Sequence, residues 1–492
     1  MKLLPIFLSD SYKQFHHLMY PEDIELLYSN MTPRSFKRLL GCEHAVFFGL
    51  QYYIKKYLME EWNTFFATPF SEIERQYRRF HKHFSGCDVT VDHWKKLHDL
   101  GYMPIVVYAL PEGSLVPEKV PFYTIYNTHP DFAWLVNFLE TQMSTVIWDM
   151  TTVATIAHMY RQKLDKWAEK TGDPSFVQWQ GHDFSMRGRS SMESAYACQA
   201  GHLLSFTGTD TIPAVFMLED YYDANIEKEL VGGSVPATEH SVMTSYGKEE
   251  EIVAFERLLD LFPSGVLSIV SDSFDLWKVC TEYVTTLKDK IMARNGKLVI
   301  RPDSGDPVDI VCGTIKGLVD YQYTVTNAEI GVVELLWNVF GGTVNEKGYK
   351  VLDPHIGVIY GDSITLDRAE QICQRLADRG FASTNVVFGI GSYTYNHNTR
   401  DTLGTAIKAT FCRVGKERRE IFKDPVTDDG VKKSARGLLK VVKENGELKL
   451  QDQCNAEDFN NSDNDQLKLV FAEGHIIEKT SLNDIRNRLR NG

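Results

Sequence analysis

The sequence has 492 residues, a formal net charge of −13, and 43% hydrophobic and 24% charged residues. This length predicts roughly two to four domains with a large core, and the composition is typical of a soluble globular protein. The negative charge argues against a general nucleic-acid-binding surface, and no stretch approaches the ~18 unbroken apolar residues of a membrane span. Eight scattered cysteines without a C-x-x-C pair, and an N-terminus without a long apolar signal core, predict a cytoplasmic protein with free thiols.

The first part of the chain, to about residue 150, mixes helical patterns with short strands. Residues 49–62 (GLQYYIKKYLMEEW) repeat apolar side chains at helical spacing. Residues 102–117 (YMPIVVYALPEGSLVP) predict a strand followed by a turn. Residues 131–170 form a long helical tract with aromatic and aliphatic stripes, which we interpret as packed core helices.

From about residue 180, apolar runs recur, and each of them ends in small or acidic residues. These runs are LLSFTGTD (203–210), VLSIVSDSFD (266–275), KLVIRPDSGD (297–306), IGVIYGDS (356–363) and NVVFGIGS (385–392). Helix-like tracts lie between them, such as residues 249–262 and 364–380. This alternation predicts βα units and a parallel sheet, in which the carboxyl ends of the strands converge on one pocket. Beyond residue 400 the chain becomes polar and hairpin-like, with a turn signal at Asn445-Gly446.

The predicted strand ends supply the groups that a phosphorylated sugar requires. Carboxylates accept hydrogen bonds from a vicinal diol, glycines allow close backbone approach to a phosphate, and arginines bind phosphate oxygens in bidentate fashion. The carboxylates are Asp303 and Asp362, the glycines are Gly361, Gly389 and Gly391, and the arginines are Arg187, Arg301 and Arg400. Taken singly, an aspartate after a strand is also typical of a helix N-cap, and these glycines are also typical of turns.

His240 lies in the segment GGSVPATEHSVMTSYG (232–247), and it is either a core histidine or a catalytic group. Its neighbours Glu239 and Ser241, and the glycine-rich approach, favour a functional role.

Several motifs then occur in the order and spacing of one known family. They are SDSYKQFHHLMYP (9–21), HDFSMRGRSS (182–191), FTGTDT (206–211), SVPATEHS (234–241), VSDSFD (270–275), IRPDSGDP (300–307) and GDSI (361–364). Over nearly its whole length the chain resembles the nicotinamide phosphoribosyltransferases. The sister family, the nicotinate phosphoribosyltransferases, shares the fold but resembles these segments less closely.

The resemblance implies an α/β fold, with an irregular (β/α) barrel of the type II phosphoribosyltransferase kind at about residues 150–385. Residues 1–149 and the C-terminal part of 386–492 would build a flanking α/β domain, and the phosphate loop would open the latter segment. The implied reaction transfers the phosphoribosyl group of 5-phosphoribosyl 1-diphosphate to nicotinamide, with Mg²⁺ held mainly through the diphosphate. ATP would be a facultative co-substrate that phosphorylates His240.

The resemblance also implies roles for individual residues. Phe184 would stack on the pyridine ring, and Tyr12 would close its other face from the partner subunit of a homodimer. The remaining assignments are Arg187, His240, Arg301 and Arg34 to the diphosphate, Asp303, Gly361 and Asp362 to the ribose, and Ser392 and Arg400 to the 5′-phosphate. His240 and Asp303 would be the catalytic residues. For Phe184 and Tyr12 the alternative is plain core packing.

Asp210 is the residue that we expect to select the base. An ionised carboxylate accepts a hydrogen bond from the neutral carboxamide of nicotinamide and repels the anion of nicotinate. The alternative is that Asp210 caps the following helix.

One segment departs from the family pattern. Residues 388–400 (FGIGSYTYNHNTR) carry Ile390, Ser392 and Tyr393 where more glycine is usual. The alternatives for the whole protein are a nicotinate phosphoribosyltransferase and a non-enzymatic ligand-binding or signalling protein on the same scaffold. Retention of His240, Asp303 and Asp362 argues against the second.

Overall fold

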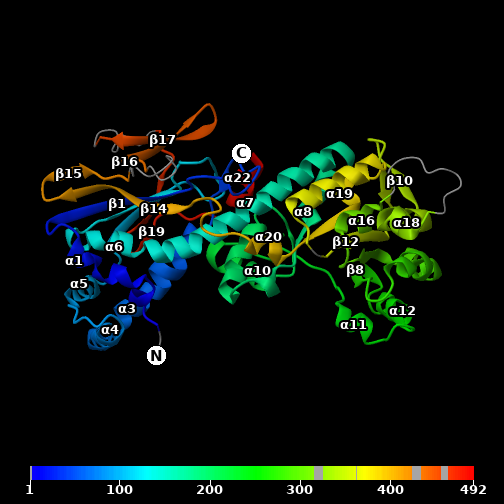
Figure 1. Cartoon of the computed structure of the whole chain (residues 1–492), viewed down its shortest axis with the longest axis horizontal. Helices are drawn as coiled ribbons and strands as arrows, with labels where there is room; N and C mark the ends of the chain where they lie inside the picture. Colours follow the sequence, from blue (N-terminus) through cyan, green and yellow to red (C-terminus); the bar gives the residue numbers. More distant parts are fainter. Residues whose placement is uncertain (1–2, 315–324, 362, 424–433, 456–463, 492) are drawn as a thin grey trace. The chain divides into compact units, whose positions relative to one another are not determined.

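The structure, a computed structural model, describes residues 3–314, 325–361, 363–423, 434–455 and 464–491 (Figure 1). It divides into two compact units. The barrel unit comprises Ile156–Phe216 and Asn225–His397, and the flanking unit comprises Met1–Thr155, Met217–Ala224 and Asn398–Gly492. None of the helices in the described ranges has both the length and the hydrophobicity of a membrane-spanning segment.

The barrel unit contains a six-stranded parallel sheet in the order β7-β6-β13-β12-β9-β8. Its strands are β6 (Gly181–Asp183), β7 (Gly208–Thr209), β8 (Ser264–Val270), β9 (Asn295–Arg301), β12 (Ile356–Tyr360) and β13 (Val386–Ile390). Residues 233–238 connect the two edges of this sheet. They pair in parallel with β7 through Gly208 and Gly233, and with β8 through Ser268 and Ala237. The sheet is therefore curled into an irregular barrel, and the predicted fold class is confirmed.

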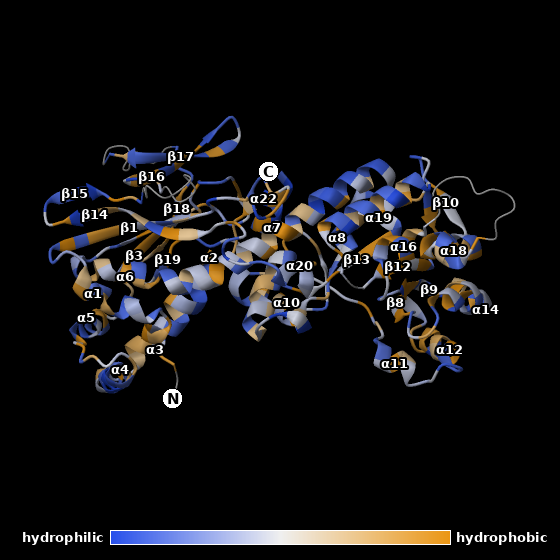
Figure 2. Ribbon diagram, viewed as in Figure 1, coloured by the Kyte–Doolittle hydropathy of each residue, from blue (hydrophilic) through white to orange (hydrophobic). Residues whose placement is uncertain are grey.

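Helices follow these strands, as the alternating pattern predicts. They are α8 (Val177–Gln180), α9 (Gln199–His202), α11 (His240–Thr244), α12 (Glu251–Leu261), α13 (Leu276–Lys278), α14 (Val284–Thr286), α15 (Lys288–Met292), α16 (Pro307–Cys312), α17 (Asn327–Ile330), α18 (Val332–Phe340), α19 (Leu366–Asp378) and α20 (Ser392–Asn396). Helix α19 buries Ala369, Ile372, Cys373 and Leu376, a helical spacing of apolar residues. Figure 2 shows the complementary hydrophilic side of this helix and the apolar strands β12 and β13. A two-stranded ribbon, β10 (Gly342–Val344) with β11 (Lys350–Leu352), completes the unit.

The flanking unit is built on a seven-stranded antiparallel sheet in the order β15-β14-β1-β5-β3-β18-β19. Its strands are β1 (Ile24–Thr32), β3 (Ile105–Ala109), β5 (Tyr123–Asn127), β14 (Ala406–Val414), β15 (Glu417–Glu420), β18 (Lys468–Ala472) and β19 (His475–Ile476). Strand β1 pairs with β14, and β3 pairs with β18, so segments from the two ends of the sequence share one sheet. Two further ribbons are β2 (Ala45–Val46) with β4 (Leu115–Val116), and β16 (Leu438–Glu444) with β17 (Glu447–Cys454). Asn445 and Gly446 join β16 to β17 with positive φ angles, as the turn signal predicts.

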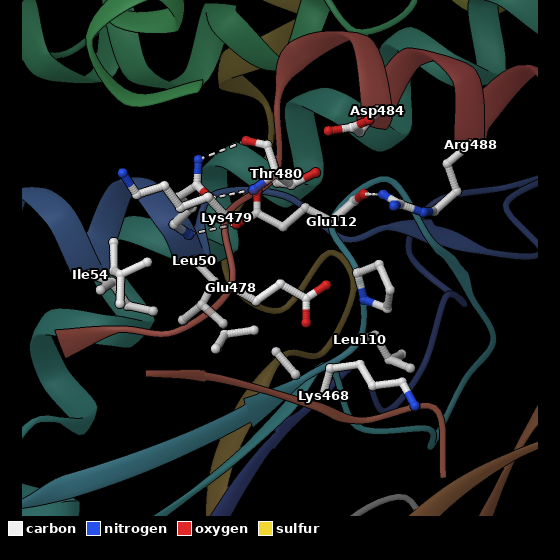
Figure 3. Close-up of a pocket in the computed structure, with 15 residues that line it drawn as sticks. Leu50, Ile54, Leu110, Glu112, Lys468, Glu478, Lys479, Thr480, Asp484 and Arg488 are labelled. Atoms are coloured by element: carbon white, nitrogen blue, oxygen red, sulfur yellow. Dashed lines mark hydrogen bonds between the residues drawn. The ribbon is translucent and has the colours of Figure 1, made fainter. Parts of the chain in front are cut away.

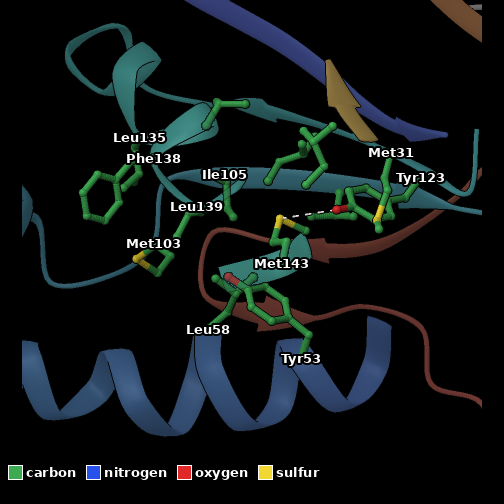
Figure 4. Packing of buried hydrophobic residues seen from close by; sticks show 14 of the residues in the cluster. Met31, Tyr53, Leu58, Met103, Ile105, Tyr123, Leu135, Phe138, Leu139 and Met143 are labelled. Carbon is green, nitrogen blue, oxygen red and sulfur yellow. Dashed lines mark hydrogen bonds between the residues drawn. The ribbon is translucent and has the colours of Figure 1, made fainter. Parts of the chain in front are cut away.

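Helices cover this sheet and enclose its core. They are α1 (His16–Met19), α2 (Leu50–Tyr53), α3 (Trp62–Ala67), α4 (Phe70–Phe84), α5 (Asp92–Leu100), α6 (Ala133–Phe138) and α22 (Leu482–Asn491). Two helices, α7 (Glu140–Thr171) and α10 (Ile212–Tyr222), begin in one unit and end in the other. Figure 4 shows Met31, Tyr123 and Met143 in the core, where the Tyr123 hydroxyl lies 3.7 Å from the Met143 sulfur. The tract 131–170 thus forms packed helices, as its apolar stripes predict.

Three histidines, His17, His81 and His93, pack against aromatic side chains of this core. The rings of His17 and His93 stack with their centroids 3.6 Å apart and their planes 16° from parallel. Each of the three has one ring nitrogen without a hydrogen-bond partner among the described residues. Burial lowers the pKa of all three, and it lowers the pKa of His93 well below the usual value. The fold therefore holds these rings neutral.

We expect acid to destabilise the flanking unit through His93. Because the folded-state pKa of His93 is lowered, only the unfolded chain binds a proton as the pH falls below about 6.5, and by pH 5 this costs about 2 kcal/mol of stability. The melting temperature should fall between pH 7 and pH 5, and it should fall less in a His93→Phe variant. The exposed His83, changed to Gln, is the control. Parallel pH profiles in wild type and His93→Phe would contradict the assignment.

Candidate functional site

A cavity of about 840 Å³ opens at the carboxyl ends of the barrel strands. Residues at the ends of five strands line it: Phe184, Asp210, Gly361 and Gly391 follow β6, β7, β12 and β13, and Arg301 is the last residue of β9. Among its lining residues are seven that the sequence predicts as site residues, namely Phe184, Arg187, Asp210, Arg301, Gly361, Gly391 and Ser392. The convergence expected from a parallel barrel is therefore present, and it gathers an aromatic ring, a carboxylate and three arginines in one place.

Phe184 and Arg301 form one wall of this cavity. The guanidinium of Arg301 lies over the Phe184 ring, 4.9 Å from its centroid. The backbone N–H of Phe184 donates to the carbonyl of Ile390 at 3.0 Å, which fixes the segment after β6 against the end of β13. A Cβ at Gly389 would come within 2.7 Å of the Phe184 ring, so the absence of a side chain there lets the ring take this position. The buried Nε of Arg301 has no hydrogen-bond partner among the described residues, which leaves a cationic donor for an anion.

Asp210 stands beside Phe184 with a defined orientation. Its Oδ1 lies 3.0 Å from Nε2 of His182 and accepts a 2.5 Å hydrogen bond from Oγ of Ser234. Burial would raise the pKa of Asp210, but the hydrogen bonds from His182 and Ser234 and the charge of Arg301 outweigh burial and hold that pKa below its usual value. The carboxyl group is therefore ionised at neutral pH. The Asp210 carboxylate accepts hydrogen bonds from these two side chains and, among the described residues, from no backbone N–H of α10. The helix-cap alternative is therefore not favoured.

Asp183 is a neighbour of these residues that the sequence did not lead us to predict. It ends β6, is 0% exposed, and accepts hydrogen bonds from two sides. Oδ1 accepts from the N–H and Oγ of Ser185 and from Nε2 of Gln199 at 2.6–3.0 Å, and Oδ2 accepts from the hydroxyls of Thr209 and Thr211 at 2.6–3.0 Å. Burial opposes ionisation, yet nearby His202 and these hydrogen bonds hold the pKa of Asp183 below its usual value. The network ties the end of β6 to the end of β7, where Phe184 and Asp210 follow.

His240 begins α11 and contacts a second unpredicted carboxylate, Asp272. Nε2 of His240 lies 3.2 Å from Oδ1 of Asp272, whose side chain is only 4% exposed, whereas the His240 side chain is 47% exposed. Oδ2 of Asp272 accepts hydrogen bonds from the N–H of Asp303 at 2.9 Å and from Oγ of Ser304 at 2.6 Å. Asp272 thus links His240 to the loop after β9. The sequence signal for it was its place at the end of an apolar run, which a helix cap shares.

Asp303 and Gly361 lie close together at the ends of β9 and β12. A Cβ at Gly361 would come 2.4 Å from Oδ1 of Asp303 and 3.0 Å from Nε of Arg301, so only glycine fits there without displacing both side chains. Asp362, which the sequence analysis places on the ribose, lies outside the described residues.

The segment that departs from the family pattern has an ordinary local structure. Ile390 is fully buried as the last residue of β13, and Ser392 and Tyr393 form the first turn of α20. Ser392 and Tyr393 both line the cavity, and the Tyr393 side chain is 58% exposed. Where additional glycines are usual, this chain thus has a buried Ile390 and two polar side chains, Ser392 and Tyr393, that line the cavity.

A second cavity, of about 370 Å³, lies inside the barrel unit. It shares Phe184, Asp210 and Ala237 with the first cavity, and its remaining walls include the apolar strand residues Val299 and Val358. His182 lines only this second cavity. Phe184 and Asp210 therefore stand at the boundary between a polar chamber and an apolar one.

Three predicted site residues, Tyr12, Arg34 and Arg400, belong to the flanking unit. Tyr12 and Arg400 line a separate cavity of about 250 Å³ in that unit. The segment that carries Tyr12 is held by Lys13, whose buried ammonium contacts Glu140 at 2.7 Å. Nε of Arg34 donates to the carbonyl of Gly404 at 2.8 Å.

A further cavity of the flanking unit surrounds the buried carboxylate of Glu112 (Figure 3). That carboxylate accepts hydrogen bonds from the N–H groups of Gly49 and Gln51 and from the hydroxyl of Tyr222 at 2.5–2.9 Å. These hydrogen bonds compensate the burial of the Glu112 carboxylate, and we therefore assign Glu112 a structural role. The described residues contain no group of three or more His, Cys, Asp or Glu side chains placed to hold a metal ion.

Comparisons with known proteins agree with this arrangement. The model of the nicotinate phosphoribosyltransferase (NAPRTase) family matches residues 179–475, and the model of the nicotinamide phosphoribosyltransferase N-terminal domain matches residues 5–106. The nicotinamide phosphoribosyltransferase of Acinetobacter baylyi (strain ATCC 33305 / BD413 / ADP1) is 46% identical over 503 residues, covering 99% of this chain and 97% of that protein. The nicotinamide phosphoribosyltransferase of Mycoplasma pneumoniae (strain ATCC 29342 / M129 / Subtype 1) is 34% identical, covering 85% and 92%.

Solved structures show the same fold at low sequence identity. The nicotinate-nucleotide pyrophosphorylase of Pyrococcus furiosus has a TM-score of 0.57 and 13% identity, covering 98% of this chain and 93% of that chain. Human nicotinic acid phosphoribosyltransferase has a TM-score of 0.54 and 14% identity, covering 99% and 93%. On the sequence matches, this chain belongs to the nicotinate phosphoribosyltransferase (NAPRTase) family and, within it, groups with the nicotinamide phosphoribosyltransferases.

Proposed function

We propose that this protein transfers the 5-phosphoribosyl group of 5-phosphoribosyl 1-diphosphate to nicotinamide, giving nicotinamide mononucleotide and diphosphate in NAD salvage. The observation that carries the proposal is the ionised, oriented carboxylate of Asp210 beside the Phe184 ring in a cavity that also holds Arg187 and Arg301. The cavity offers a stacking surface, an acceptor for a carboxamide and cations for a diphosphate. The names of the similar proteins support the same reaction.

The chemistry requires positioning rather than a protein nucleophile. The bond from C1 of the ribose to the diphosphate oxygen breaks, an oxocarbenium-like sugar forms, and the pyridine nitrogen attacks C1. Arg187 and Arg301 would stabilise the charge that develops on the departing diphosphate. Phe184 would orient the pyridine, because ring stacking contributes roughly 0.5–1.5 kcal/mol beyond area burial. Asp303, with Gly361 and Asp362, would hold the ribose hydroxyls and align C1 with the ring nitrogen.

The remaining substrate contacts follow from the family resemblance. Ser392 and Arg400 would bind the 5′-phosphate, and Arg34 would add a contact to the diphosphate. Mg²⁺ would be held mainly by diphosphate oxygens, because the described residues offer no cluster of three metal ligands and Mg²⁺ commonly keeps substrate phosphates and water as ligands. When bound, the ion would neutralise charge on the leaving group.

Asp210 provides the test of the substrate assignment. Two like charges about 4 Å apart cost roughly 4 kcal/mol at an effective dielectric near 20, which corresponds to about a thousandfold in affinity. In an Asp210→Asn variant, we expect kcat/KM for nicotinamide to fall and the nicotinate-to-nicotinamide ratio of kcat/KM to rise by about a hundredfold or more. Both bases are assayed for mononucleotide formation, with Asp220→Asn as control, an exposed aspartate on helix α10, which follows Asp210.

Each outcome has a distinct meaning. An unchanged ratio in a folded Asp210→Asn variant would assign Asp210 to structure and favour the alternative, a nicotinate phosphoribosyltransferase. Failure of the wild-type protein to form a mononucleotide from either base would contradict the enzymatic proposal and favour a non-enzymatic nucleotide-binding or signalling protein.

We also propose that ATP phosphorylates His240. With Nε2 directed at Asp272, the tautomer that donates to this carboxylate leaves the lone pair on Nδ1. Nδ1 would attack the γ-phosphorus of ATP, the bond to the bridging oxygen would break, and ADP would leave. A phosphohistidine near the diphosphate would then raise substrate affinity and favour product formation.

A His240→Ala variant separates transfer from coupling. We expect transfer without ATP to persist at a reduced rate, because Arg187 and Arg301 still bind the diphosphate. Stimulation by ATP, and release of ADP in proportion to mononucleotide, should disappear. Measuring ADP and mononucleotide in the same reactions tests this. ATP hydrolysis that still keeps step with product formation would exclude His240 as the acceptor.

The active form that we propose is a cytoplasmic homodimer with shared sites. All eight cysteines are free thiols, a state typical of a reducing compartment. Tyr12 is 58% exposed in the flanking unit, and by resemblance it acts on the partner subunit's site. Mixing inactive Tyr12→Ala chains with inactive Asp303→Ala chains should restore part of the activity, since one site of each heterodimer is intact. Verified heterodimers without activity would contradict shared sites.

A further inference from the structure

His182 lies between the two side chains that we assign to the pyridine base. Its ring is 4.6 Å from the Phe184 ring, centroid to centroid, at an angle of 44°. Its Nε2 lies 3.0 Å from Oδ1 of Asp210, and only 12% of its side chain is exposed. Because His182 and Phe184 alternate with Asp183 along the chain, their side chains share one face of the strand. A single ring therefore touches both proposed base contacts.

The hydrogen bonds on Asp210 are unevenly divided between its two oxygens. His182 and Ser234 both address Oδ1, at 3.0 Å and 2.5 Å. Oδ2 has no hydrogen-bond partner among the described residues. This division fixes the rotation of the carboxylate and leaves one oxygen for the carboxamide N–H₂ of a bound base. Ser234 alone would hold the same oxygen through a single rotatable hydroxyl.

The His182 ring packs against the backbone of Gly208, a position without a side chain. A Cβ at Gly208 would lie 2.8 Å from Nδ1 of His182, so the ring packs directly on the β7 backbone. Other charged and titratable groups near it have their own partners. Asp183 is bound in its buried network, His202 contacts the carbonyl of Gly208 at 3.1 Å, and Arg301 lies over Phe184. Nε2 of His182 is thus directed at Asp210.

We propose that His182 is a positioning residue that sets the selectivity for nicotinamide over nicotinate by fixing the carboxylate of Asp210. This inference rests on the proposed function and adds a residue for which the sequence analysis had no role. His182 makes no transfer step itself. It acts through Asp210, so its removal should affect base binding more than the rate of the bound complex.

Two substitutions separate the effect of the His182 hydrogen-bond donor from the effect of its ring. His182→Leu removes the hydrogen-bond donor, whereas His182→Gln places an amide N–H near the position of Nε2. We expect His182→Leu to raise KM for nicotinamide by about tenfold to a hundredfold, the range for loss of a hydrogen bond to a charged group, and to change kcat much less. The nicotinate-to-nicotinamide ratio of kcat/KM should rise as well. His182→Gln should restore both quantities to within about threefold of wild type.

A double-mutant cycle tests whether His182 acts through Asp210. In an Asp210→Ala background, which removes both side-chain oxygens, His182→Leu should change the selectivity ratio by less than about twofold, because the group on which it acts is absent. An undiminished effect in that background, or no rescue by His182→Gln, would overturn the proposal. If His182→Leu does not fold, His182→Asn replaces it, since its shorter amide does not reach Asp210. Wild-type mononucleotide formation is measured alongside, so failure of the proposed function is recognised separately from failure of this inference.

Discussion

The buried carboxylate of Asp183 is the interaction on which the geometry of the barrel cavity depends. An ionised group with 0% exposure is unfavourable unless hydrogen bonds compensate its lost hydration, and here the donors come from Ser185, Gln199, Thr209 and Thr211. Those donors belong to the turn after β6, to α9 and to the end of β7. Satisfying one carboxylate therefore fixes three segments together. Phe184 and Asp210 follow directly from two of these segments, so their spacing is set by a group that does not face the cavity.

Similar carboxylates after strands perform different tasks in this protein, which limits what the sequence can predict. The run KLVIRPDSGD contains Asp303, which lies beside Gly361, and Asp306, which accepts from the N–H groups of Val308 and Asp309 and caps α16. Asp272 and Asp275 divide in the same way, because Asp275 caps α13 whereas Asp272 links His240 to the next loop. The strand ends were predictable from the alternation of apolar runs and polar tips. The role of each carboxylate depends on its through-space partners, and these come from distant parts of the chain.

Local signals predicted local structure well, and long-range pairing was not visible in them. The turn at Asn445-Gly446 and the helices α12 and α19 follow from spacing and turn chemistry within a few residues. The closure of the barrel by residues 233–238 does not, because those residues pair through isolated bridges and have no apolar alternation. The pairing of β1 with β14 joins residues from opposite ends of the sequence, as in Thr32 with Ala406. The fold of the whole chain was therefore predicted from the family resemblance, because periodicity reports only on local structure.

The charge of the whole molecule and the charge of its cavity have opposite signs, and screening reconciles them. The chain carries a formal net charge of −13, yet Arg187, Arg189 and Arg301 all line the barrel cavity. At physiological ionic strength the Debye length is about 8 Å, so acidic residues elsewhere on the surface contribute little to the potential at these guanidiniums. At the cavity itself the nearby guanidiniums therefore dominate the local potential. In the proposed reaction this local potential would attract a polyanionic sugar diphosphate, while Asp210, held by His182 and Ser234, would offer a negative charge to the neutral base. The proposed function thus requires one cavity to attract an anionic substrate through its arginines and to repel an anionic base through Asp210, and the Phe184 ring, which Arg301 covers and His182 contacts, lines the same cavity.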